Sequence, residues 1–117
     1  MRDHTKLQAF ELADALAVEI YRLTRAFPKE EQFGLTAQMR RAAVSTAFNI
    51  VEGCARHTEA DYVHFLDVAY GSSRELQYQL SLAQKLGDAR AAAFAQARSL
   101  CEETSKVLNG LVRALRR

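Results

Sequence analysis

Asp61 and His64 are the pair whose types and spacing come closest to a metal-ligand motif in this sequence. A carboxylate and a histidine three positions apart share one face of a helix, and such a pair is half of the ligand set in di-metal helical bundles. A di-metal site needs the pair twice, together with further inward-facing carboxylates, whereas here the pair occurs once. Asp61 also follows Thr58 at the spacing of a capping box that begins a helix. We therefore predict no metal site and no cofactor.

The other candidates for catalysis are the histidines and cysteines. No serine or cysteine nucleophile stands in a recognisable local frame with His4, His57 or His64, and no glycine-rich loop is present that could cradle a phosphate. Cys54 and Cys101 have no metal-ligating neighbours at short spacing, so we expect two reduced thiols. The sequence predicts a protein that is not an enzyme.

A further group of polar residues lies in one segment that contains no glycine or proline. Asn49 and Glu52 are three residues apart and share a helix face, and Arg40 and Arg41 precede them in the same helix. These four residues could bind a ligand or RNA, or they could form a structural polar cluster with Glu75 that fixes the register of packed helices. We favour the structural interpretation, because buried polar groups usually pair with each other.

Four helical segments must position these residues. In each segment apolar residues recur at alternating steps of three and four, which is the periodicity of a helix seam, and no segment alternates as a strand does. The expected helices span residues of about 5–26, 35–52, 58–86 and 89–115. With 49% apolar residues and short connections, residues 1–117 are predicted to form one all-α domain, an antiparallel up-down-up-down four-helix bundle.

Single residues mark the expected ends of these helices. Pro28 is expected to end the first helix, because the residue before a proline avoids the helical region. Gly53 and Gly87 stand where C-terminal glycines occur, and Asp88 is expected to cap the start of the last helix. Gly71 lies inside the third helix, where it costs about 1 kcal/mol relative to alanine, so we expect it to permit a close helix crossing.

The second helical segment carries two apolar stripes where a surface helix needs one. One stripe consists of Met39, Ala43, Thr46 and Ile50. The other includes Val44, Phe48 and Val51. Either the other helices of one chain bury both stripes, or the second stripe lies between copies of the chain. We predict a homo-oligomer with Val44, Phe48 and Val51 at or near the interface.

Residues 33–53 also resemble the signature of a known family. The resemblance is carried by Phe33-Gly34-Leu35-Thr36, Arg40-Arg41-Ala42-Ala43-x-Ser45 and Asn49-Ile50-x-Glu52-Gly53. It is a resemblance to the bacterial four-helix-bundle proteins encoded in intervening sequences of 23S ribosomal RNA, to which the accessory variability protein of diversity-generating retroelements is similar. Two residues depart from the signature. Ala47 replaces a frequent proline, which should straighten the helix, and Phe48 replaces a small residue, which makes the second stripe bulkier.

The resemblance implies a four-helix protomer that assembles into a cyclic homopentamer, and it brings no catalytic residues. The association of this family with ribosomal RNA is one of gene location. The retroelement relative implies basic surfaces that bind RNA or DNA, and a reverse transcriptase as a partner.

Basic residues gather at one end of the expected bundle, although the net charge of +2 is too small to indicate a nucleic-acid partner by itself. The start of the first helix, the second connection and the end of the last helix meet there. The candidates for phosphate contact are Arg2, Lys6, Arg56, Arg113, Arg116 and Arg117. Alternatively, the last three arginines only complement the negative end of a helix dipole. Two functions stay open: a nucleic-acid-binding accessory protein, or a structural scaffold that binds protein.

No apolar run approaches the roughly 20 residues that span a bilayer. The N-terminal residues Met-Arg-Asp-His contain no apolar signal core. We therefore expect a cytoplasmic protein with no membrane partner.

Overall fold

Four long helices and no strand make up the computed structural model, which describes all 117 residues. The helices are α1 (Gln8–Thr24), α2 (Leu35–Cys54), α3 (Glu59–Leu86) and α4 (Ala95–Leu115). Short 3-10 turns precede three of them, η1 (His4–Lys6), η2 (Lys29–Glu31) and η3 (Ala91–Phe94). The prediction of an all-α fold with four helices is confirmed. None of the helices combines the length and the apolar character that crossing a bilayer requires.

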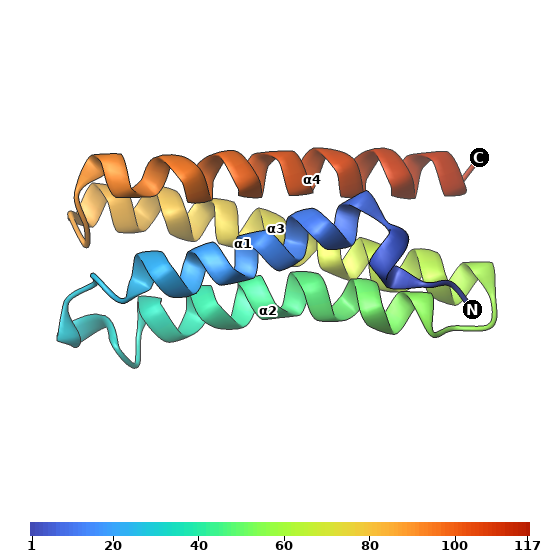
Figure 1. Cartoon of the computed structure of the whole chain (residues 1–117), viewed down its shortest axis with the longest axis horizontal. Helices are drawn as coiled ribbons and strands as arrows, with labels where there is room; N and C mark the ends of the chain where they lie inside the picture. The colour runs from blue at the N-terminus through green and yellow to red at the C-terminus, as the bar shows by residue number, and fades with distance from the viewer.

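The four helices lie side by side along the long axis of the molecule (Figure 1). Both termini and the α2–α3 connection lie at one end, and the α1–α2 and α3–α4 connections lie at the other (Figure 1). α1 packs against α2 and α4, and α3 packs against the same two helices. The α1–α2 pair and the α3–α4 pair therefore form opposite sides of the bundle.

The apolar stripes that the sequence predicts form the core, which has two parts. One part lies toward the α1–α2 connection and includes Ile20, Met39 and Leu76, and the other lies toward the termini and includes Ile50 and Leu66. All five of these side chains are fully buried. Burying a side chain of this size contributes about 1.5–3 kcal/mol relative to leaving it exposed.

A layer of hydroxyl groups separates the two parts of the core. The Ser73 and Ser105 hydroxyls are buried and 2.8 Å apart, which joins α3 to α4 by a hydrogen bond. On the other flank of α3, the Ser72 and Ser45 hydroxyls are also 2.8 Å apart and join α3 to α2. The buried Thr46 hydroxyl donates to the carbonyl of Ala42 in its own helix. Each hydroxyl of this layer thus has a partner, as buried polar groups require.

The expected helix boundaries hold for α2 and α3 within a few residues and differ at the starts of α1 and α4. Residues 4–6, near the expected start of the first helix, form η1, in which the Asp3 carboxylate accepts from the Thr5 backbone N–H at 3.0 Å. α1 then begins at Gln8 and ends at Thr24, two residues before its expected end. α4 begins at Ala95 instead of residue 89, because the preceding residues form η3.

The role predicted for Asp88 is wrong. Asp88 does not cap α4, because η3 begins after Arg90 and α4 begins after Phe94, neither with a side-chain cap hydrogen bond. Its backbone N–H donates instead to the Ala83 carbonyl at 3.1 Å and completes the C-terminal cap of α3. Gly87 supplies the other part of that cap: it has a φ of 72°, and its N–H donates to the Gln84 carbonyl. The prediction for Gly87 is therefore confirmed. Asp88 is buried near Glu31 of η2, and burial followed by the neighbouring Glu31 carboxyl group raises the pKa of Asp88 to about 6.

The expected roles of Gly53 and Gly71 are wrong. Gly53 does not end α2, which continues to Cys54. A Cβ at Gly53 would lie 3.1 Å from the Phe65 Cβ and 3.2 Å from the Tyr62 carbonyl oxygen, so this glycine permits the close approach of α3 to α2. A Cβ at Gly71 would meet nothing within 4 Å. The close crossing expected at Gly71 therefore lies at Gly53.

Candidate nucleic-acid interface

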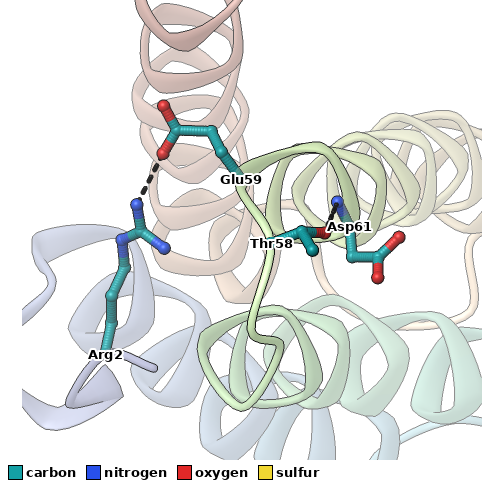
Figure 2. A network of polar contacts seen from close by, with 4 residues as sticks. All are labelled: Arg2, Thr58, Glu59 and Asp61. Carbon is teal, nitrogen blue, oxygen red and sulfur yellow. Dashed lines mark hydrogen bonds and ion pairs between the residues drawn. The ribbon is translucent and has the colours of Figure 1, made fainter.

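No group of three or more His, Cys, Asp or Glu side chains is arranged to hold a metal ion. Asp61 and His64 are exposed near the start of α3. The Asp61 backbone N–H donates to the Thr58 hydroxyl at 3.1 Å, and its carboxylate points away from this cap (Figure 2). Asp61 therefore belongs to the helix cap.

Both cysteines are free and buried, and neither lies in a reactive environment. Burial raises the pKa of the Cys101 thiol to about 12, and its S–H group donates to the Ser73 carbonyl at 3.3 Å. Burial also raises the pKa of Cys54. A thiol with a raised pKa is a poor nucleophile at neutral pH, because the thiolate is the reactive form.

The structure does not bring Arg40, Arg41, Asn49 and Glu52 together. Arg40 reaches α1, where its Nε donates to the Thr24 hydroxyl at 2.9 Å. The Asn49 side chain donates to the Ser45 carbonyl, one turn earlier in its own helix, at 2.8 Å. Arg40 and Asn49 thus form their hydrogen bonds with different partners and not with each other.

Glu52 and Arg41 differ in whether they have a partner. Glu52 forms an ion pair of 3.4 Å with Arg56, one turn later. Arg41 is exposed and makes no hydrogen bond or ion pair, although it lines a pocket between α2 and α3 together with Glu75. The interaction expected between the arginines and Glu75 is therefore not made.

At the end of the bundle that holds both termini, Arg2 binds the N-terminal segment to α2 and α3. Its guanidinium lies 2.6 Å from a carboxylate oxygen of Glu59 in the first turn of α3 (Figure 2). The same guanidinium lies 3.8 Å from the centre of the Tyr62 ring. The Arg2 backbone N–H donates to the Cys54 carbonyl at 2.7 Å. Arg2 is thus committed to contacts within the chain.

Two more of the six expected basic residues have carboxylate partners. Arg56 pairs with Glu52, and Arg116 lies 3.2 Å from Asp67 of α3. Lys6, Arg113 and Arg117 are exposed and have no carboxylate within ion-pair distance, so their charges are free to meet a phosphate. Arg113, Arg116 and Arg117 together line a pocket of about 390 Å³ between the ends of α3 and α4.

This pocket is one end of a groove that continues along the bundle between α3 and α4. It shares Tyr70 and Asn109 with the next pocket, which shares Arg74, Gln77 and Glu102 with a third. We call this feature the α3–α4 groove. Its cationic residues are Arg74, Arg98, Lys106, Arg113, Arg116 and Arg117, and its carboxylates are Asp67 and Glu102.

The middle and far part of this groove was not predicted from the sequence. The signal that could have found it is a polar stripe on one face of α4. It runs through Arg98, Glu102, Lys106, Asn109, Arg113 and Arg116, at steps of three and four. The contribution of α3, from Tyr70 to Tyr78, depends on how the two helices pack.

The second apolar stripe of α2 is not buried by the other helices. The exposed fractions of Val44 and Phe48 are 45% and 57%, and Val51 is half-buried. Val44 and Phe48 line an open pocket between α2 and Tyr21 of α1. The alternative in which one chain buries both stripes is therefore wrong.

Residues 5–110 match the family model of the 23S rRNA-intervening sequence protein. The chain belongs to this family. Among solved structures, it is similar to a protein of unknown function from the S23 ribosomal protein family of Bacteroides thetaiotaomicron. The TM-score is 0.82 at 22% sequence identity, with 90% of this chain and 95% of that chain covered. Among curated proteins there is no match.

Two residues of this chain depart from the family signature, and both lie on α2. At Ala47, where a proline is frequent, the helix continues without a break to Cys54. At Phe48, the large ring projects from the half-exposed second stripe. The departures therefore alter the surface of the bundle and leave its helix order intact.

Proposed function

We propose that this protein is a non-enzymatic accessory protein that binds RNA or DNA, in the cytoplasm, as a cyclic homopentamer of antiparallel up-down-up-down bundles. The observation that carries the proposal is a pair of arginines, Arg113 and Arg117, that are exposed and lack carboxylate partners at one end of the bundle. Arg116 lies beside them in the same pocket.

The chemistry of these arginines suits phosphate. A guanidinium presents several N–H donors and a charge that does not titrate at neutral pH, and it matches phosphate oxygens in two-pronged geometry. None of the three guanidinium groups donates to a C-terminal carbonyl of α4; the one contact among them is from Arg116 to Asp67. Charge of this kind binds the backbone of any sequence, so we expect little sequence preference.

Assembly would strengthen this binding. The half-exposed stripe of Val44, Phe48 and Val51 is the surface that we propose lies at or near the interface between copies. A ring repeats the arginines of each protomer, and several weak phosphate contacts on one strand gain affinity through multivalency. The stripe belongs to the α1–α2 side of the bundle and the arginines belong to the α3–α4 side. A second copy bound to the stripe would therefore leave the arginines accessible to nucleic acid.

A fluorescence-anisotropy titration with labelled RNA and DNA at low salt tests the proposal. The variant Arg113→Ala/Arg116→Ala/Arg117→Ala should bind all sequences more weakly, and its slope of log affinity against log salt should fall by about 2 for a single strand. The matched control is Arg22→Ala/Arg25→Ala/Arg90→Ala, which removes the same charge elsewhere on the molecule.

The second candidate function is a structural scaffold whose partner is a protein, for which a reverse transcriptase is the candidate that the retroelement relative implies. The exposed apolar stripe of α2 favours it, because such a surface suits a protein partner. An intact oligomer that binds neither RNA nor DNA at micromolar concentration would exclude the nucleic-acid proposal and leave the scaffold function as the candidate.

A further inference from the structure

We propose that the α3–α4 groove binds a single strand of RNA or DNA, whose phosphates follow the basic side chains and whose bases stack on Tyr78. This inference rests on the proposed nucleic-acid binding and adds to it the path of the strand and its unpaired state. The groove extends well beyond the end of the bundle where the three C-terminal arginines lie.

The charge of the groove is the first argument. Six cationic side chains line it against two carboxylates. Arg74 and Arg98 have neutral partners: Arg74 donates to the Tyr70 hydroxyl at 3.1 Å, and Arg98 donates to the Gln84 side-chain oxygen at 2.8 Å. Their charges are thus not neutralised by the protein. A phosphate could replace these neutral acceptors with a charged one, and charge-assisted hydrogen bonds are the stronger kind.

The exposed aromatic ring is the second argument. Tyr78 is 67% exposed in the same groove and makes no hydrogen bond within the chain. A large ring beside arginines, exposed in a basic groove, is the arrangement by which proteins bind single strands, because every base has a face that can stack. Tyr70 lies further along, partly buried, with its hydroxyl held by Arg74.

The shape of the groove favours one strand over two. Neighbouring packed helices have axes about 8–10 Å apart, so the groove between them admits one backbone. From Arg98 to Arg113 the groove follows α4 for fifteen residues, which is about 22 Å at the rise of a helix. In a duplex the base faces are covered by stacking, so Tyr78 could not reach them.

Three variants test the path of the strand, with a labelled oligonucleotide of mixed sequence and its blunt duplex as probes. Arg74→Ala/Arg98→Ala should weaken single-strand binding about tenfold and lower the salt slope by about 1.4, the value for two lost phosphate contacts. Tyr78→Leu should weaken single-strand binding about tenfold, leave the salt slope unchanged and leave duplex binding unchanged. The control Arg22→Ala/Arg25→Ala removes the same charge from the C-terminal end of α1 and its cap. Helix content and sedimentation must match the parent protein in every case.

The outcomes separate this inference from the proposed function. The parent protein should bind the single strand about tenfold more tightly than the duplex. If Arg74→Ala/Arg98→Ala and Tyr78→Leu bind like the α1 control, while loss of the three C-terminal arginines still weakens binding, the groove proposal fails and the proposed function stands. If the parent protein binds neither probe, both fail.

Discussion

The same substitution, glycine to alanine, should have opposite effects at two positions of this bundle. Gly71 lies inside α3 and Gly53 lies in the last turn of α2, and alanine is favoured over glycine by up to about 1 kcal/mol in a helix. At Gly71 a new Cβ would meet nothing within 4 Å. Gly71→Ala should therefore raise the free energy of unfolding by about 0.5–1 kcal/mol.

At Gly53 a steric cost opposes this gain. The new Cβ would lie 3.1 Å from the Phe65 Cβ and 3.2 Å from the Tyr62 carbonyl oxygen. Both atoms are fixed to the backbone of α3, so α2 and α3 must separate slightly along their interface. Overpacking of this kind costs about 1–3 kcal/mol, which exceeds the propensity gain. We expect Gly53→Ala to lower the free energy of unfolding by roughly 1 kcal/mol.

Urea unfolding followed by circular dichroism measures both variants, at one protomer concentration because assembly would add to the apparent stability. A difference of about 2 kcal/mol between the variants corresponds to several degrees in the unfolding temperature. Equal stabilisation of Gly53→Ala and Gly71→Ala would refute this prediction, since the close approach of α3 at Gly53 would then carry no steric cost.

Two further predictions concern assembly and pH. Phe48→Glu should dissociate the oligomer in a sedimentation experiment while the circular dichroism spectrum stays helical, because Phe48 is 57% exposed in the single chain. The control is Phe33→Glu, at an 89% exposed residue of the α1–α2 connection. Unfolding of the Phe48 variant would contradict the prediction. Burial and the neighbouring Glu31 raise the pKa of Asp88 in the folded state to about 6 from 3.8, so the folded state binds the proton more tightly than the unfolded state. The free energy of unfolding should therefore fall as pH rises from about 4 through 6. Asp88→Asn should remove this part of the pH dependence in urea titrations, and an unchanged profile would count against it.

Much of the fold could be predicted because apolar periodicity is a local signal. The stripe of Met39, Ala43, Thr46 and Ile50 is fully buried, as expected for the face of a helix that packs inward. The end of α3 at Gly87 was also predictable, because a left-handed residue after a helix favours glycine whatever surrounds it.

The errors arise where the role of a residue depends on distant neighbours. A glycine in a helical segment shows that a small residue is tolerated, but only packing decides that α3 comes close to Gly53 and leaves Gly71 open. Asp88 has the side chain of an N-cap, yet the next helical turn begins only after Arg90, and Asp88 instead completes the cap of α3 with its backbone N–H.

The candidate site was predicted only where the chain topology brings termini and a connection to one end of the bundle. Several of the charges expected to be free there have partners, such as Glu59 for Arg2 and Asp67 for Arg116. Pairing across more than forty residues of sequence cannot be inferred from residue types. The groove was missed for a related reason, since its two walls come from different helices and the exposure of Tyr78 depends on their contact.

The hydroxyl layer in the middle of the bundle limits how the helices can be aligned. Seams that repeat every seven residues are nearly interchangeable, so α3 could slip by one heptad and still meet mostly apolar neighbours. Such a slip would separate Ser73 from Ser105 and Ser72 from Ser45, which now lie 2.8 Å apart in each pair. A buried hydroxyl left without a partner costs about 1–3 kcal/mol. The serines thus penalise the misaligned states, and replacing Ser73 and Ser105 together by alanine would remove one of the two penalties while Ser72 and Ser45 keep the other.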